Sequence, residues 1–370
     1  MRNNSSVTNF SYQIPVQIYF GRGYFQRLAE WVRGRRVLII TSAGFVERGL
    51  VDKLNAAAIW PVAVVSDISP NPTLSQMAAI YTRLDRSQFD VILAIGGGSV
   101  MDSAKVFSVD APHFSLISQY ILGEISHLHY TTTPLICVPT TAGTSSELTP
   151  WATIWDMDLK QKFSLHLPDL WPEACIYDPE LTHSLPRQLT LQTGLDALSH
   201  CLESIWNIQA NPISTAFAIQ GAKLILATLP DLLSDLDNQQ CRDQMMLATV
   251  YAGLAFSNTQ TAVAHAISYY LTAKYGVAHG IACSFSLPHI AYVAQGISEP
   301  VDAALNEIFG QNPSEKIKAF FDTIGVSHLL WTYLPQDDFP ELCRSVFQNN
   351  RIKNGIVPMD TLFEVLRTAC

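Results

Sequence analysis

Four side chains that commonly bind divalent metals lie in the second half of the chain. Asp196 and His200 are four residues apart in GLDALSH, so on a helix they project from one face. His265 follows in the apolar stretch AVAHAI, and His279 follows in VAHG. One carboxylate and three imidazoles suit Fe²⁺ or Zn²⁺ equally well. Helix-surface pairing and core packing are the alternatives, and the spacing alone leaves open whether the four residues converge.

Two glycine- and threonine-rich segments come directly after apolar runs. The first is GGGS at 96–99, and the second is PTTAGTSSE at 139–147. Glycines let backbone N–H groups approach a ligand, and a helix N-terminus adds partial positive charge, which together suit a diphosphate. The first segment lacks the GxGxxG spacing of the common dinucleotide fingerprint. A tight strand–helix turn and a polar helix cap remain the alternative interpretations of the two segments.

The elements expected to position these groups divide the chain in two. Apolar runs at 36–41, 62–66, 91–95 and 135–138 predict strands, with helical patterns at 44–58 and from residue 73. Helical periodicities dominate later, at 197–206, 215–229, 243–256 and 265–273. We therefore predict an α/β domain with a parallel sheet over residues 1–185 and an all-α domain over 186–370. A cleft between them is the expected place for a site.

Composition limits the class of protein. Of 370 residues, 48% are hydrophobic and 15% are charged, which excludes wholesale disorder. The net charge of −9 argues against nucleic acid as a partner. No unbroken apolar run approaches the roughly 18 residues of a membrane span, and the N-terminal sequence shows no apolar core of a secretion signal. Seven cysteines without a CxxC pair indicate a reducing compartment, so we expect a cytoplasmic protein.

Five segments together resemble the iron-containing alcohol dehydrogenase family. They are GGGSVMDSAK, PTTAGTSSE, GLDALSHCLE, AGLAFSNTQTAVAHAIS and VAHGIACSFSLPH, in family-like order and spacing. The resemblance implies a Rossmann-like N-terminal domain and a helical C-terminal domain, the fold shared with dehydroquinate synthase. It implies Fe²⁺ or Zn²⁺ on Asp196, His200, His265 and His279. It also implies contacts to NAD(H) or NADP(H) from Asn71, Gly97, Gly98, Ser99, Asp102, Thr140, Thr141, Thr144 and Lys162.

The chemistry implied by the resemblance is reversible aldehyde reduction. The metal would act as a Lewis acid on the carbonyl or alkoxide oxygen, and the nicotinamide would transfer hydride. The family also implies a homodimer or a larger homo-oligomer.

Two positions depart from the family pattern. Family members often carry a second histidine four residues after the first of the late pair, and here Tyr269 takes that place. We expect Tyr269 to act in proton transfer or to pack, although a phenol is a weaker base at neutral pH. Relatives that prefer NAD often place an aspartate after the first strand, and here Ser42 stands there. We therefore expect NADPH to be accepted.

Within the family, the chain looks most like the branch that reduces phosphonoacetaldehyde. The family pattern puts Trp151, Phe256 and Tyr269 near the substrate. A phosphonate needs a cation or hydrogen-bond donors. Candidates are Lys274, Arg351 and Lys353, each of which also fits a solvated surface charge, and Gln260 is an uncharged candidate.

Rival interpretations keep the fold and change the activity. A general small-aldehyde or primary-alcohol dehydrogenase is the nearest rival. Dehydroquinate synthase, glycerol dehydrogenase and maleylacetate reductase share the superfold. A non-catalytic nucleotide-binding protein is the rival from another class, and metal analysis would separate it from an enzyme.

Overall fold

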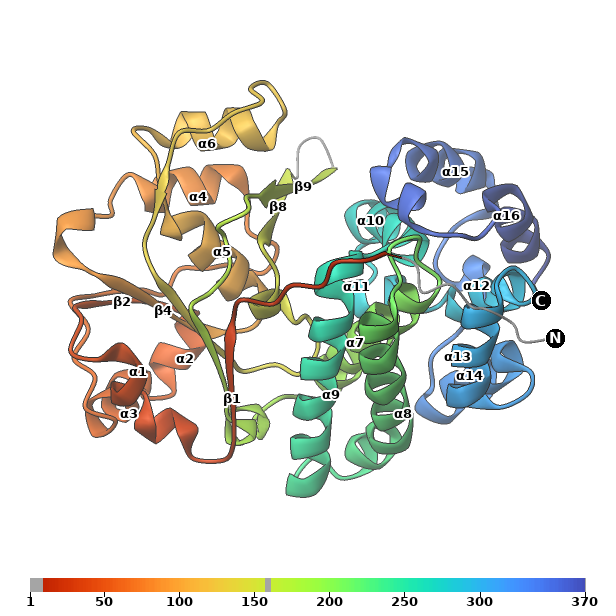
Figure 1. The fold of residues 1–370 in the computed structure, drawn as a ribbon, viewed down its shortest axis with the longest axis horizontal. Helices are drawn as coiled ribbons and strands as arrows, with labels where there is room; N and C mark the ends of the chain where they lie inside the picture. Colours follow the sequence, from red (N-terminus) through yellow and green to blue (C-terminus); the bar gives the residue numbers. More distant parts are fainter. Residues whose placement is uncertain (1–8, 157–160, 370) are drawn as a thin grey trace.

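The computed structural model describes residues 9–156 and 161–369, so the first eight residues of the N-terminal sequence and Cys370 lie outside it. An α/β half and a helical half lie side by side (Figure 1). Six parallel strands form one sheet in the order β1-β10-β7-β4-β2-β3. The strands are β1 (Gln17–Phe20), β2 (Val37–Ile40), β3 (Ala63–Val65), β4 (Val91–Gly96), β7 (Leu135–Pro139) and β10 (Ala174–Tyr177). The predicted parallel sheet and two-part fold are confirmed.

Both faces of the sheet are covered because its central strands are apolar at successive residues. Leu38 and Ile92 point to one face, which packs on α4 (Leu74–Tyr81), α5 (Gly98–Ser108) and α6 (Phe114–Ile121). Ile39 and Leu93 point to the other face, against α1 (Ala29–Val32), α2 (Ala43–Glu47) and α3 (Leu50–Ala56). The single helix predicted at 44–58 is wrong. Gly49 adopts φ 78°, which ends α2 and starts α3.

Several strands were not predicted from the sequence. β1 and β10 have four residues each, and β5 (Val109–Asp110) pairs with β6 (Thr131–Thr132). An antiparallel hairpin of β8 (Trp151–Asp156) and β9 (Gln161–His166) pairs Trp155 with Lys162. The alternate residues of the hairpin that line the cleft are Trp151, Thr153, Trp155, Lys162 and Ser164. The hairpin therefore carries one wall of the cleft.

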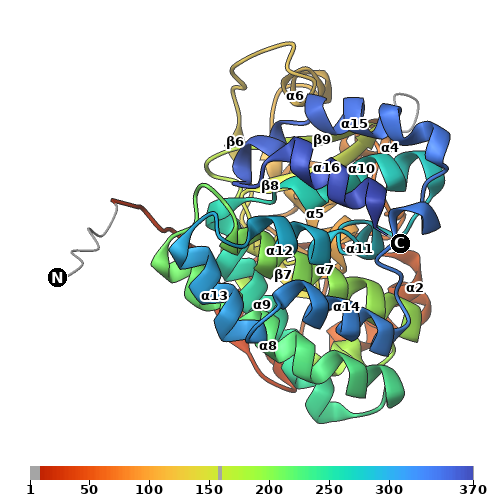
Figure 2. The same cartoon turned by 90° about the vertical axis from the view of Figure 1, so that its right-hand side faces the viewer.

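The helical half is built around three long packed helices. They are α7 (Arg187–Ile205), α8 (Pro212–Ser234) and α9 (Gln239–Thr259). α7 begins ten residues before the predicted helix at 197–206. The later helices are α10 (Val263–Tyr275), α11 (His279–Ala282), α12 (Leu287–Ala294), α13 (Glu299–Phe309), α14 (Pro313–Ile324), α15 (Phe339–Gln348) and α16 (Met359–Thr368). Figure 2 shows α12, α13, α14 and α16 on the outer side of this half.

By length and composition alone, α8 is apolar enough to cross a membrane. However, it packs against α7 and α9, and half of its most apolar window is buried inside the protein. Core helices of soluble proteins pass the same test, so α8 is weak evidence for a membrane segment.

Candidate active site

The four predicted metal ligands converge in the cleft. Asp196 and His200 lie one turn apart on α7, His265 lies on α10, and His279 begins α11. Asp196 Oδ1 is 3.6 Å from His200 Nε2, 3.5 Å from His265 Nε2 and 3.7 Å from His279 Nε2. Ligands at about 2.1 Å from a tetrahedral metal would be about 3.4 Å apart, so this donor set fits a divalent ion.

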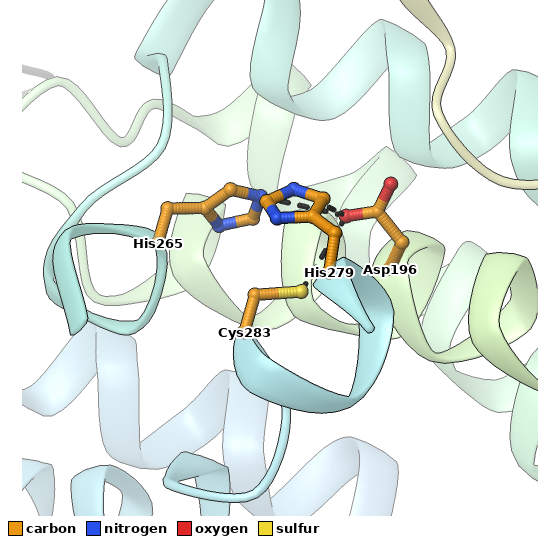
Figure 3. Close-up of side chains that lie close together, drawn as sticks. All are labelled: Asp196, His265, His279 and Cys283. Atoms are coloured by element: carbon orange, nitrogen blue, oxygen red, sulfur yellow. Dashed lines mark hydrogen bonds and ion pairs between the residues drawn. The ribbon is translucent and has the colours of Figure 1, made fainter. Parts of the chain in front are cut away.

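Cys283 and Glu203 complete the cluster, and sequence analysis missed both. Cys283 Sγ lies 3.5 Å from Asp196 Oδ1, and Figure 3 shows it pointing at the same centre as Asp196, His265 and His279. The Glu203 carboxylate is fully buried, and its Oε2 lies 2.6 Å from His265 Nδ1. Such a carboxylate fixes the orientation of an imidazole ligand. Glu203 follows His200 by three residues on the same helix face, and this spacing could have placed Glu203 in the cluster from the sequence alone.

The protonation of the cluster favours a cation. Burial raises the pKa of Asp196, but the three neighbouring imidazoles lower it well below its usual range. Burial lowers the pKa of His200 to about 4 and that of His279 to about 3, so both rings are neutral donors at pH 7. Burial also opposes charge on His265, but Glu203 and Asp196 raise its pKa to about 9.

With a pKa of about 9, His265 carries a proton at pH 7, which balances only one of the two buried carboxylates, so the cluster still needs compensating positive charge. A divalent ion would supply that charge. The Cys283 thiol is a different kind of neighbour, because burial raises its pKa well above the usual range. It is therefore a neutral S–H donor to Asp196.

A cavity of about 600 Å³ extends from this cluster along the carboxyl ends of the parallel strands. That edge is where open α/β sheets bind ligands. Gly97 precedes α5, and a Cβ on Gly98 would lie 2.9 Å from the Thr144 side chain, so the glycine loop packs closely on the threonine loop. The predicted nucleotide contacts that line the cavity are Ser42, Asn71, Gly97, Gly98, Ser99, Asp102, Thr140, Thr141, Thr144 and Lys162.

The far end of the cavity contains an arginine that sequence analysis missed. Arg48 lines this end together with Ser42 and Phe45, and its guanidinium carbon lies 4.5 Å from the centre of the Phe45 ring. The backbone N–H of Asn71 donates a hydrogen bond to Ser99 Oγ at 3.3 Å, and Asn71 adopts φ 55°.

Aromatic side chains form the wall near the metal ligands. Phe256 stacks on His200 with ring centres 4.0 Å apart and meets Trp151 edge-on at 5.8 Å. Tyr269 stacks with His279 at 6.4 Å, and Lys162 Nζ lies 4.2 Å from the centre of the Tyr269 ring. Burial would raise the pKa of Tyr269, but Lys162 and other neighbouring cations lower it to about 8. Trp151, Phe256 and Tyr269 all line the cavity.

Gln260 does not line this cavity. It lines an adjacent cavity of about 890 Å³ that also contains Lys162, Tyr269 and Arg351. Gln260 follows the last residue of α9 and adopts φ 63° and ψ 173°. Residues other than glycine rarely adopt this backbone conformation, which costs them about 1–3 kcal/mol. Its side-chain oxygen accepts a hydrogen bond from Arg351 Nη1.

The three predicted cations differ in their surroundings. Lys274 is paired with Glu341 at 2.7 Å and with Asp338 at 3.1 Å, so its charge is already balanced. Lys353 is exposed and donates to Asn350 at 3.0 Å. Arg351 lines both cavities. Only Arg351 among the three reaches the space beside the metal ligands.

Family models match most of the chain. The model described as iron-containing alcohol dehydrogenase matches residues 15–179, and the model of the C-terminal part of that family matches residues 190–355. Alcohol dehydrogenase 4 of Saccharomyces cerevisiae is 32% identical over 85% of this chain and 84% of the relative. The 1,3-propanediol dehydrogenase of Klebsiella pneumoniae is also 32% identical, over 83% of this chain and 81% of the relative.

A solved structure is similar over nearly the whole chain. It is the sulfoacetaldehyde reductase from Bifidobacterium kashiwanohense in complex with NAD⁺, with a TM-score of 0.90 and 28% identity. The comparison covers 98% of this chain and 100% of that one. These matches favour an oxidoreductase over the non-catalytic rival and over dehydroquinate synthase. The chain belongs to the iron-containing alcohol dehydrogenase family, as its motifs predict.

Proposed function

We propose that the protein is a metal-dependent, NAD(P)-linked aldehyde reductase and alcohol dehydrogenase. The convergence of Asp196, His200, His265 and His279 at the end of the long cavity is the observation that carries this proposal. A divalent metal, Fe²⁺ or Zn²⁺, would supply Lewis acidity at the substrate oxygen, and the nicotinamide would supply or accept hydride.

The protein's own residues hold and orient the reactants. Glu203 fixes the His265 ring through Nδ1 and leaves Nε2 free for a metal. The glycine and threonine loops hold the diphosphate of the nucleotide, and Asp102 contacts another part of it. Phe256 and Trp151 exclude water from the reacting centre. Tyr269, beside His279, donates a hydrogen bond to the substrate, where it replaces the second histidine of relatives.

The direct test is oxidation of NADH and NADPH by the Fe²⁺- or Zn²⁺-loaded protein, with short aldehydes as substrates. We expect absorbance at the nicotinamide band to fall only when protein, aldehyde and metal are all present. Full turnover by a metal-free preparation would disprove the mechanism.

The substrate proposal is a short aldehyde that carries a tetrahedral anionic group, with phosphonoacetaldehyde as our first candidate. It is supported by Arg351, which lies beside the metal ligands and forms no ion pair within the described part of the chain, and by the similarity to a sulfoacetaldehyde reductase, whose name specifies an aldehyde of this kind. A general small-aldehyde dehydrogenase is the alternative, and the same assay with an uncharged aldehyde separates the two.

The nucleotide end of the cavity supports use of NADPH. Ser42 carries no charge to repel a 2′-phosphate, and Arg48 lines the same end without an ion pair among the described residues. We expect Arg48→Gln to raise the KM for NADPH roughly tenfold, by loss of a charge-assisted hydrogen bond, and to leave the KM for NADH nearly unchanged. Steady-state kinetics with both nucleotides would measure this. A strong preference of the wild type for NADH would contradict it.

The cellular setting is also a proposal. The six cysteines of the described part are free thiols, which supports the cytoplasm. Val64 in edge strand β3 and Trp60 and Val62 just before it are exposed, which supports a homodimer or larger homo-oligomer. Cell fractionation and sedimentation at micromolar concentration would test the two proposals, and a strictly monomeric protein would reject the second.

A further inference from the structure

Two cationic side chains occupy the wall between the two cavities. Lys162 on β9 and Arg351 in the 3-10 segment η7 (Asn350–Asn354) line both the metal-side cavity and its neighbour. Among the described residues, neither forms an ion pair with a carboxylate, in contrast to Lys274. Partly buried cations that lack an anionic partner favour binding of an anion.

The guanidinium of Arg351 is held from several sides. Gln260 Oε1 accepts a hydrogen bond from Nη1, and the guanidinium carbon lies 5.9 Å from the centre of the Trp151 ring. The backbone of η7 is fixed as well, because Asn349 Oδ1 accepts from Arg351 N at 2.9 Å and Asn354 Nδ2 donates to Thr261 O at 2.8 Å. Arg351 is therefore pre-organised before any ligand binds.

Gln260 keeps a strained backbone while it holds Arg351. Its φ of 63° and ψ of 173° lie in a region that glycine adopts freely. Its carbonyl accepts a hydrogen bond from Asn207 Nδ2 at 3.1 Å, which holds the peptide in place. A strained residue beside an arginine that has no ion pair among the described residues is typical of a functional position, and the amide side chain is the feature that glycine would lack.

Lys162 and the metal ligand His279 both lie close to the ring of Tyr269. Lys162 Nζ is 4.2 Å from the centre of the Tyr269 ring, and the His279 ring stacks with Tyr269 at 6.4 Å. A molecule that reaches from the metal ligands to these cations is therefore short.

We propose that Lys162 and Arg351 form an anion subsite, with Gln260 as the residue that positions Arg351. The subsite recognises the terminal tetrahedral oxyanion of a short aldehyde, either a phosphonate or a sulfonate, while the aldehyde group faces Asp196 and the three histidines. This inference rests on the proposed function, because it assumes that the aldehyde reacts at the metal ligands.

The kinetic test uses the full, metal-loaded protein with phosphonoacetaldehyde, sulfoacetaldehyde and uncharged propionaldehyde. We expect Arg351→Gln to lower kcat/KM for the anionic aldehydes roughly 10- to 100-fold, mainly through KM, and to change propionaldehyde turnover far less. Lys353→Gln is the matched control, because it removes a charge from the same segment at an exposed position, and it should have no effect. The better of the two anionic substrates identifies the head group.

Binding without turnover gives a second readout. Ethylphosphonate and ethanesulfonate carry the head groups but no aldehyde, and we expect calorimetry to show that wild type binds them and that Arg351→Gln binds them at least tenfold more weakly. Gln260→Gly keeps the backbone conformation without strain, so we expect an unchanged or higher Tm together with weaker binding of both probes.

The outcomes separate this inference from the proposed function. If wild type reduces none of the three aldehydes, the proposed function fails. If it reduces propionaldehyde as efficiently as the anionic aldehydes, the subsite is overturned and the function stands. If Gln260→Gly lowers kcat/KM equally for charged and uncharged aldehydes, Gln260 does not position Arg351.

Discussion

Replacement of Asp196 by asparagine is expected to lower kcat at least 1000-fold and to reduce bound metal to a small fraction of one ion per chain. Asp196 Oδ1 lies within 3.7 Å of Nε2 of all three histidines, so it is the common neighbour of the cluster. An amide cannot supply the negative charge, and loss of a Lewis acid removes several kcal/mol of transition-state stabilisation. Metal analysis and steady-state kinetics on the same preparation would measure both effects.

Glu147→Gln is the matched control for this substitution. Glu147 is also a buried carboxyl group, but it accepts a hydrogen bond from Tyr177 in the α/β half. An amide has the same shape and can accept the same hydrogen bond from Tyr177 through its oxygen, so we expect metal content and turnover to be retained. Nucleotide affinity, measured by fluorescence titration, should be equal in both variants and the wild type. An Asp196→Asn protein with wild-type turnover would rule out the proposed ligand set.

The sequence predicted which site residues lie close together where they share one helix. Asp196 and His200 are four residues apart, and helix geometry alone puts them on one face. Glu203 continues that face and could have been predicted in the same way. His265 and His279 lie on separate helices, so their approach to Asp196 depends on how α10 and α11 pack against α7, which no local spacing encodes. Family resemblance supplied that part.

The conformation of Gln260 and several strands could not be predicted from the hydrophobic pattern of the sequence. Gln260 has an ordinary sequence context, yet tertiary contacts hold it at φ 63°. β1 (QIYF) and β10 (ACIY) lack the continuous runs of aliphatic residues from which β2 (VLII) and β4 (VILAIG) were predicted. The β8–β9 hairpin, which brings Lys162 to the cleft, was also not predicted.

Gly280→Ala is expected to destabilise the fold by at least about 3 kcal/mol and to lower metal affinity strongly. Gly280 directly follows His279, and a Cβ at this position would lie 1.8 Å from the backbone oxygen of Gln192 on α7. Because backbone atoms cannot move aside as a side chain can, α11 has to shift away from α7. His279 would then leave Asp196, and a displacement of about 1 Å is enough to cost about 100-fold in turnover.

Urea unfolding and metal titration of Gly280→Ala would test this expectation, with Gly355→Ala as the control. Gly355 has an ordinary φ of −89°, and a Cβ there would only touch Ala262 at 3.6 Å, so we expect that variant to match the wild type. If Gly280→Ala unfolds and binds metal like the wild type, the close approach of α11 to α7 is not what holds His279 beside Asp196. If it folds stably but binds metal weakly, the packing of these two helices sets the geometry of the metal site.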